Sequence, residues 1–307
     1  MKKTSIITMA AAVLLIAALA AGCAAPASSP SAPATTAPTT APATTAPATA
    51  TTEALSGKIT VVGSTSVGPY IDALAKNFMT KNPGVTINVQ QVGSGQGIAN
   101  TIDGTADIGM SSRELKDSEK PLVEFKMAKD GIAVVVQKDN PVNALTKDQI
   151  KDIYMGKIKN WKELGGSDAA INLYTRESTS GTRGGFEELV LGKNAEGKQV
   201  TIDEKICAAV LNSTGDLAAA VGKDKNGIGY ISLGVLATYP DDKALDVDGV
   251  KATTDNVGNG SYKIQRDFLL LTKSEPAGIV KAFLDYVLTD KESTDYQTSK
   301  GLVPIAK

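Results

Sequence analysis

The chain has 307 residues, with 32 Lys and Arg against 33 Asp and Glu, so its formal net charge is −1. This near-neutral balance argues against nucleic acid as a partner, because backbone binding needs a clustered basic face. The chain has no histidine, which removes the usual general base, the Ser-His-Asp triad and most zinc sites. The composition therefore favours a binding protein over an enzyme and predicts neither a cofactor nor a metal.

The N-terminus has the pattern of a secretory leader. Lys2 and Lys3 precede an apolar run over residues 6–21, which ends in the sequence Leu19-Ala-Ala-Gly-Cys23. This predicts a signal peptide over residues 1–22, cleaved before a lipid-carrying Cys23 that anchors the protein to the outer face of the cell membrane. The leucine stands one place further from Cys23 than in the commonest lipobox. The alternative is an uncleaved membrane anchor, for which the run is short against the roughly 18 apolar residues expected.

A low-complexity segment follows the leader. Every residue from 24 to 52 is Ala, Pro, Ser or Thr. Such a segment has no apolar surface to bury, and its prolines keep it extended. Residues 23–57 are therefore predicted to be the lipidated cysteine and a disordered tether.

Three short hydroxyl-rich loops follow predicted strands in the first part of the globular region. The strand over residues 59–62 leads to Ser64, Thr65 and Ser66, and then to an amphipathic helix over residues 70–79. The alternating run over residues 85–92 predicts a second strand, after which Ser94 precedes the helical segment 98–102. A third apolar run, over residues 106–110, delivers Ser111, Ser112 and Arg113. Hydroxyls and free helix amides at the ends of strands are typical of an anion site.

The remaining elements continue the alternation of strands and helices. Thr146 and Gln149 have the spacing of a capping box and predict a helix start. Further strands are predicted over residues 132–136, 171–174, 227–231, 264–271 and 303–305, and a helix over residues 277–288. This alternation predicts an α/β architecture.

The most informative stretch is Arg176-Glu-Ser-Thr-Ser-Gly-Thr-Arg183. Two fixed-charge guanidinium groups flank four hydroxyl donors, and a helical pattern begins directly afterwards. The stretch predicts an oxyanion trap; the alternative is a helix cap carrying two surface arginines. Arg183 fits a ligand contact and a salt bridge at the start of the helix equally well.

These motifs together resemble the phosphate-binding protein of the high-affinity phosphate ABC transporter. The resemblance extends over residues 58–307, and its blocks occur in the family's order. They are Gly63-Ser-Thr-Ser-Val-Gly-Pro69, Val92-Gly-Ser-Gly95, Asp107-Ile-Gly-Met-Ser-Ser-Arg-Glu-Leu115, Gly156-Lys-Ile-Lys-Asn-Trp161 and the Arg176 stretch.

The resemblance implies particular ligand residues. Phosphate would be bound by Thr65, Ser66, Ser94, Ser112, Arg176, Ser180, Gly181 and Thr182, with Ser64, Arg113 and Arg183 as further ligand or orienting residues. The chain departs from the family at Ser112 and Ser178, where well-known members carry a carboxylate. Because such an acid accepts the proton of hydrogen phosphate, its absence leaves that role to a hydroxyl, to Glu177 or to Asp107.

The resemblance also implies a two-lobed periplasmic-binding-protein-like fold of type II with the ligand between the lobes. Residues 58–133 plus 256–307 would form lobe I, and residues 134–255 would form lobe II. The protein would be a monomeric receptor that delivers inorganic phosphate to the permease of an ABC transporter. The alternatives are a receptor for sulfate, molybdate or tungstate, a phosphate-ester enzyme, and a surface adhesion protein.

Several other residues favour structural interpretations. Trp161 and Tyr230 are predicted to pack in the core, Asp107 to hold its loop through backbone amides, and Cys207 to be a buried, inert thiol. Arg113 is predicted to orient a loop or bind a carboxylate near Glu114.

Overall fold

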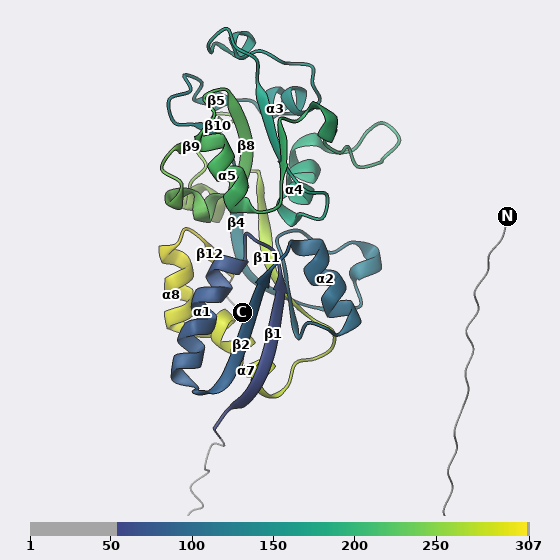
Figure 1. Cartoon of the computed structure of the whole chain (residues 1–307), viewed down its shortest axis with the longest axis vertical. Coiled ribbons are helices and arrows are strands. Elements are labelled where there is room, and N and C mark those ends of the chain that lie inside the picture. The colour runs from purple at the N-terminus through teal and green to yellow at the C-terminus, as the bar shows by residue number, and fades with distance from the viewer. Residues whose placement is uncertain (1–53, 306–307) are drawn as a thin grey trace, which may run out of the picture. The chain divides into compact units, whose positions relative to one another are not determined.

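The computed structural model describes residues 54–305. The predicted signal peptide, Cys23 and most of the tether lie outside the described residues. Figure 1 shows two α/β lobes one above the other, joined by the long strand β4 and by β11. None of the described helices combines the length and apolar character needed to cross a membrane.

The lower lobe in Figure 1 contains both ends of the described chain. Its strands and helices are β1 (Ser56–Gly63), α1 (Gly68–Lys81), β2 (Gly84–Gln91), α2 (Ser94–Asp103), β3 (Ile108–Ser111), β11 (Gln265–Thr272), α7 (Gly278–Thr289), α8 (Lys291–Ser299) and β12 (Val303–Pro304). The strands β1, β2 and β3 are parallel, and β11 pairs antiparallel with β3. Since parallel strands end at the same edge of a sheet, the three hydroxyl-rich loops meet at one edge.

The upper lobe contains the middle of the chain. Its elements are β5 (Ala144–Leu145), α3 (Lys147–Tyr154), β6 (Asn172–Arg176), α4 (Gly181–Phe186), β7 (Ala209–Leu211), α5 (Thr214–Gly222), β8 (Gly227–Ser232), β9 (Asp242–Ala244) and β10 (Asp246–Val247). The short helix α6 (Thr254–Gly258) lies where the lobes meet and contacts β4 and β12. A π-helical turn over Glu187–Leu191 continues α4, and 3₁₀ turns lie at Trp161–Leu164, Glu204–Ile206 and Leu233–Thr238. A further 3₁₀ turn, Asp117–Glu119, follows β3 in the lower lobe.

One sheet runs through both lobes, in the order β2-β1-β3-β11-β4-β8-β6-β7, and β9 and β12 also pair with β4. The strand β4 (Val123–Gln137) carries this continuity, because residues 123–131 pair with β11 and residues 132–136 pair with β8. The alternating elements confirm the predicted α/β class. The prediction of β4 was too short, since its first half alternates polar and apolar residues and only its second half is uniformly apolar.

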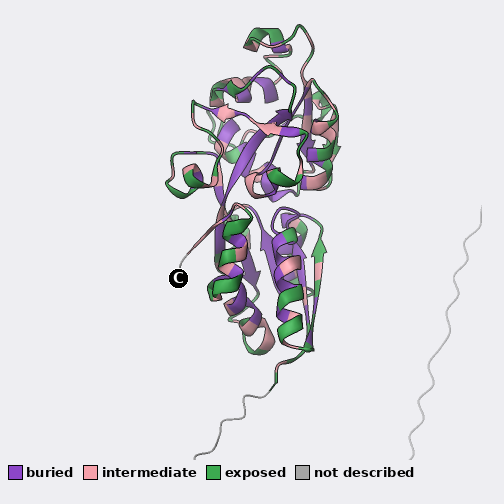
Figure 2. Ribbon diagram, turned by 90° about the vertical axis from the view of Figure 1, so that its left-hand side faces the viewer, coloured by how far each residue is buried: buried purple, intermediate pink, exposed green. Residues whose placement is uncertain are grey.

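Two main cores bury the faces of the helices that turn toward the sheet, as the purple interior of Figure 2 shows. The first includes Ile71, Leu74 and Phe283 from α1 and α7. The second surrounds the stacked rings of Phe186 and Tyr230, whose centroids are 4.1 Å apart. Trp161 is 1% exposed in this second core, and its Nε1 donates to the carbonyl of Asn226, so the packing role predicted for it is confirmed.

Local sequence features set where helices begin and how closely they pack on the sheet. Thr146 accepts from the N–H of Gln149 and forms the predicted capping box of α3. The helix α2 packs its Gly97 directly on β1, where an added Cβ would lie 2.5 Å from the carbonyl oxygen of Val62. A side chain at residue 97 would therefore push the start of α2 away from the loop that follows β1.

Candidate functional site

Four helices begin at the surfaces where the two lobes face each other. The helices α1 and α2 belong to one lobe, and α4 and α5 belong to the other. The free N–H groups and the positive dipole end of each helix favour an anion at this position. The side chains that line it are no more than 8% exposed, and they are Ser64, Thr65, Ser66, Ser94, Ser112, Arg176, Ser180, Thr182 and Thr214.

Hydroxyl groups from opposite lobes are within hydrogen-bonding distance of each other. The Ser66 Oγ lies 2.8 Å from the Thr182 Oγ1 and 2.8 Å from the Thr214 Oγ1. Thr65 also accepts a hydrogen bond from the N–H of Thr214, over 3.2 Å. The N–H of Gly95 donates to the carbonyl of Thr179, so the backbones of the two lobes also meet. The lobes are therefore closed on one another around a group of hydroxyls that can each donate and accept.

A second group of hydroxyls lies beside the first, and its members all belong to the lower lobe. Ser64 donates to the Oγ of Ser112 over 2.9 Å, and Ser112 in turn lies 3.3 Å from the Oγ of Ser94. The backbone of Gly181 reaches this group from the other lobe, because an added Cβ would lie 2.2 Å from the Ser94 Oγ and 2.6 Å from the Ser112 Oγ. The structure thus brings all eight principal predicted site residues together in one region.

The contact at Gly181 makes closure of the lobes sensitive to a single methyl group. We expect Gly181→Ala to fold normally in its own lobe, because α4 tolerates alanine, but to hold the lobes apart. Affinity for an oxyanion measured by calorimetry should fall at least about tenfold, since an incomplete donor shell binds more weakly. Gly184→Ala, in the same helix, serves as the control, because its added Cβ meets only the flexible side chain of Arg113, at 3.1 Å. Equal affinities for the two variants would contradict the proposed closure.

Arg176, at the end of β6, is 1% exposed and is held by several partners. Its Nε and Nη2 donate to the two carboxylate oxygens of Glu177, each over 2.8 Å, and further bonds reach the carbonyls of Leu211 and Asn212. Its Nη1 donates to the Thr214 Oγ1, over 3.1 Å, among the hydroxyls. A rigid guanidinium with one nitrogen at the hydroxyl group suits an oxyanion.

The aromatic core fixes the backbone of this arginine. The hydroxyl of Tyr230 accepts from the N–H of Arg176 and lies 2.7 Å from the Thr175 Oγ1. Burial raises the pKa of Tyr230 above its ordinary value, so the phenol stays neutral. Tyr230 is 1% exposed and lies in the core as predicted.

The carboxylates near the site have other partners. Glu177 is bound to Arg176 in the bidentate arrangement described above. Asp107 accepts from the N–H of Thr60 over 2.7 Å, which confirms its predicted structural role. Ser178, one of the two positions at which an acid was expected by resemblance, is exposed. The hydroxyls of Ser94 and Ser112, beside Gly181, and that of Ser64, bonded to Ser112, therefore remain as acceptors.

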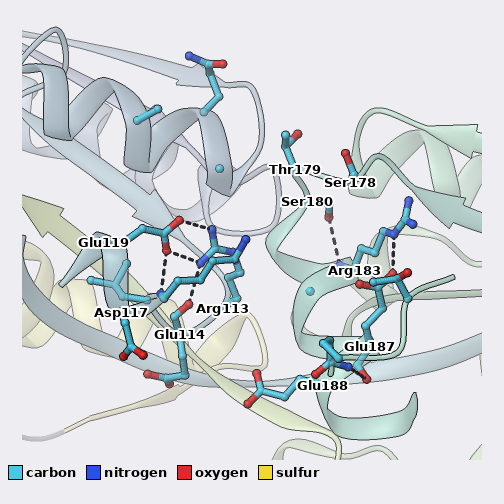
Figure 3. Close-up of a pocket in the computed structure, with 18 of the residues that line it drawn as sticks. Arg113, Glu114, Asp117, Glu119, Ser178, Thr179, Ser180, Arg183, Glu187 and Glu188 are labelled. Atoms are coloured by element: carbon cyan, nitrogen blue, oxygen red, sulfur yellow. Dashed lines mark hydrogen bonds and ion pairs between the residues drawn. The ribbon is translucent and has the colours of Figure 1, made fainter. Parts of the chain in front are cut away.

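Arg113 and Arg183 lie outside the group of hydroxyls, along a groove of about 1090 Å³ between the lobes (Figure 3). Arg183 donates to the carboxylate of Glu187 and to the carbonyls of Arg176 and Ile202. Arg113 forms a bidentate pair with Glu119, at 2.8 and 2.9 Å. Of the two interpretations open for Arg183, the structure favours the salt bridge at the start of the helix.

Thr214 belongs to the site but was missed in the sequence. It follows β7 and begins α5, and Ser213 caps that helix by accepting from the N–H of Asp216. The signal was the run Asn212-Ser-Thr-Gly215 with an acid three residues after the serine, a helix start of the same kind as the others. The short strand before it, Ala209–Leu211, gave no periodicity to mark it.

Cys207 is half-buried, not fully buried as predicted, because it lies at the end of a 3₁₀ turn near the surface. Burial nevertheless raises the pKa of its thiol to about 11, so the thiolate is scarce at neutral pH, as an inert thiol requires. Within residues 54–305 no group of three or more Cys, Asp or Glu side chains is arranged to hold a metal ion.

The fold and the site can be compared with known proteins. A family model described as the PBP superfamily domain matches residues 42–291. The phosphate-binding protein PstS of Bacillus subtilis is 36% identical over 259 residues, covering 82% of each chain, and that of Staphylococcus haemolyticus is 32% identical over 260 residues, covering 77% of this chain and 78% of the relative.

Solved structures agree with these relatives. A phosphate ABC transporter substrate-binding protein from Clostridium perfringens with bound phosphate is 44% identical, with a TM-score of 0.73, and the match covers 81% of this chain and all of the other. An ABC-type phosphate transport receptor from Vibrio cholerae is 35% identical, with a TM-score of 0.64 over 80% of this chain and 99% of the other.

The two-lobed fold with a closed polar site at the helix ends is that of the PBP superfamily. Within this superfamily, the chain belongs to the family of PstS phosphate-binding proteins, as its identity and coverage against these relatives show.

Proposed function

We infer that the protein is an extracytoplasmic receptor that binds inorganic phosphate and delivers it to an ABC transporter. The observation that carries this function is the convergence of buried hydroxyls from both lobes, with Arg176, at the N-termini of four helices. The relatives named as phosphate-binding proteins, and the similar structure with bound phosphate, support the same ligand.

The geometry suits a small tetrahedral anion. Its oxygens would replace the bonds that the hydroxyls of Ser66, Thr182 and Thr214 make to one another across the lobes. Since donors come from both lobes, only the closed form completes the shell, and the ligand therefore favours that form. The transporter would recognise the closed form.

We assign lobe I to residues 58–133 plus 256–307 and lobe II to residues 134–255, with β4 and β11 as the crossing strands.

The site favours binding over catalysis. The hydroxyls have no histidine to activate them, and the nearby carboxylate of Glu177 is bound to Arg176. A hydroxyl without a base is a weak nucleophile but a good hydrogen-bond donor.

We further assign the N-terminal segment as a signal peptide followed by a lipid anchor at Cys23. This anchor would hold a monomeric receptor at the outer face of the membrane through the tether of residues 23–57.

Sulfate is the competing ligand, because among the described residues that line the site no carboxylate is free to accept the proton of hydrogen phosphate. A serine hydroxyl can accept that proton, and it can instead donate to an unprotonated oxygen, so it discriminates less than an acid does. Molybdate and tungstate share the tetrahedral shape and belong to the same alternative.

Calorimetric titration of the protein, freed of bound anion, tests the function. We expect tight binding of phosphate, weaker binding of sulfate, and no turnover of a chromogenic phosphate ester. Equal or reversed affinities for the two anions would move the assignment to a general oxyanion receptor. Release of the chromophore would support the enzyme alternative.

A further inference from the structure

A buried ion pair lies where the chain crosses between the lobes. Arg266 of β11 is directly opposite Asp130 of β4, and its Nη2 donates to the Asp130 Oδ2 over 3.0 Å. The two side chains are 3% and 0% exposed. Two residues further along β4, at Ile132, the pairing changes from β11 to β8, so this pair lies next to the crossing point.

The two partners differ in how completely they are hydrogen-bonded. Asp130 also accepts from the Ser232 Oγ, over 2.8 Å, and from the N–H of Gly234. The Nε and Nη1 of Arg266 are buried but have no hydrogen-bond partner among the described residues. A buried guanidinium that leaves two of its three nitrogens unpaired is costly, and structures rarely keep such groups without a use.

The unpaired nitrogens lie between the two helices that carry the hydroxyls. On one side is α4, where an added Cβ on Gly185 would lie 3.9 Å from the Arg266 Nη1. Gly185 is one helical turn after Gly181, on the same face of α4. On the other side the guanidinium lies over the ring of Phe268, 5.4 Å from its centroid, and that ring contacts Tyr70 in the first turn of α1.

The charge of Arg266 interacts with that of Arg176, the arginine predicted to bind the anion. Burial lowers the pKa of Arg266, and the positive charge of Arg176 acts in the same direction. Two guanidinium groups that influence each other share one region of the protein. Each has its own carboxylate, Glu177 for Arg176 and Asp130 for Arg266, so the region is balanced in charge before an anion arrives.

We propose that Arg266 is the second guanidinium of the anion site, and that its Nε and Nη1 donate to the bound anion from the floor of the cleft while Asp130 holds the side chain in place. The proposal rests on the proposed function. It assigns a ligand role to a residue of the crossing strand, far in sequence from the four loops. A dianion between two guanidinium groups offsets the repulsion between them, so this arrangement favours a doubly charged ligand.

The test compares variants of the full chain, purified in detergent, by calorimetry with inorganic phosphate. Asp130→Asn combined with Arg266→Met removes both charges, so no carboxylate is left without its partner. We expect phosphate affinity to fall about 30- to 100-fold, and to fall further at about pH 8 than at about pH 5, because phosphate carries the second charge only at the higher pH. Arg266→Lys should recover part of the loss, since it keeps the charge with fewer donors.

A matched control uses the same two strands. Lys126→Met combined with Asp267→Asn removes an ion pair of β4 and β11 that is more exposed, with an Nζ to Oδ2 distance of 2.8 Å. We expect this variant to bind phosphate as the unmodified protein does. If Arg266 is only structural, the Asp130→Asn, Arg266→Met variant should have a lower melting temperature. The phosphate affinity of its folded form, and the pH dependence of that affinity, should then be unchanged. That result would overturn the inference, whereas failure of the unmodified protein to bind phosphate would overturn the proposed function itself.

Discussion

Arg176→Ala is expected to remove phosphate binding almost entirely. The side chain is 1% exposed and places its Nη1 among the hydroxyls of the site, so the substitution deletes a charge-assisted donor that water cannot replace. Truncating a buried charged partner costs about 2–5 kcal/mol, which is a loss of about 30-fold to several thousand-fold in affinity. Calorimetric titration with phosphate measures this loss directly.

The same substitution also leaves Glu177 without its partner, which complicates a simple interpretation. Glu177 accepts two hydrogen bonds from Arg176, and its side chain is 20% exposed. Combining Arg176→Ala with Glu177→Gln removes that unpaired charge. We expect the double variant to regain thermal stability but not phosphate affinity. Recovery of binding in the double variant would show that the anion contacts other groups and that Arg176 acts only by neutralising Glu177.

Most residues of the candidate site could be predicted from the sequence because each of its loops has a local signature. The loops with Ser64 to Ser66, Ser94, Ser112 and Ser180 to Thr182 each follow a strand, and all of them except the Ser112 loop lead directly into a helix. The physical reason is that the end of a strand and the start of a helix are set by short-range patterns. Residues predicted from such patterns therefore fall together when the strands are adjacent and parallel.

The residues that the sequence did not reveal depend on long-range pairing. Arg266 lies in a strand whose relevant neighbour, Asp130, is 136 positions away, and no local pattern connects the two. Glu177 was considered as an acceptor for the ligand proton, whereas the structure uses it to hold Arg176. The choice between these roles depends on side-chain direction at the end of β6, which the composition of the loop does not determine.

Charge balance explains how a buried site can remain stable and still accept an anion. Arg176 pairs with Glu177, and Arg183 pairs with Glu187, so each buried guanidinium near α4 already has a carboxylate. Because these pairs are internally neutral, the ligand adds its charge to a region without a net positive charge, and it is bound by the charge-assisted donor of Arg176 together with hydroxyl and amide donors. Such a site releases its ligand more readily than one with uncompensated positive charge, as a delivery protein requires.

The second large effect is expected from a substitution of Asp242, which should change the free energy of unfolding and not the binding of phosphate. Its carboxylate lies at the C-terminal end of α5, where the Oδ1 would be 3.0 Å from a Cβ added to Gly222, and neither oxygen has a hydrogen-bond partner among the described residues. Asp241 is adjacent in the chain and is paired with Lys138, and the exposed Lys223 borders the same small cavity of about 190 Å³. Burial first, and the charge of Asp241 second, raise the pKa of Asp242 from 3.8 to about 7.

The direction of the pH effect follows from this raised pKa. Between about pH 4 and pH 7 the unfolded chain ionises at Asp242 while the folded chain keeps its proton, so stability falls as the pH rises through this range and is constant above it. A shift of this size corresponds to a loss on the order of 4 kcal/mol. We therefore expect Asp242→Asn, which cannot ionise, to be more stable than the unmodified protein by about 2–4 kcal/mol at pH 8 and to show little gain near pH 4.

Denaturant unfolding of the two proteins at several pH values measures this difference. Asp241→Asn is the control, because it removes only a surface ion pair with Lys138, which contributes less than about 1 kcal/mol. Phosphate must be absent in all samples, since a ligand that binds only the folded state would add its own stabilisation. If the extra free energy of unfolding of Asp242→Asn is the same at pH 4 and pH 8, the carboxylate is neutralised by a partner, such as Lys223 in another rotamer. Burial of Asp242 then does not limit the stability of the upper lobe.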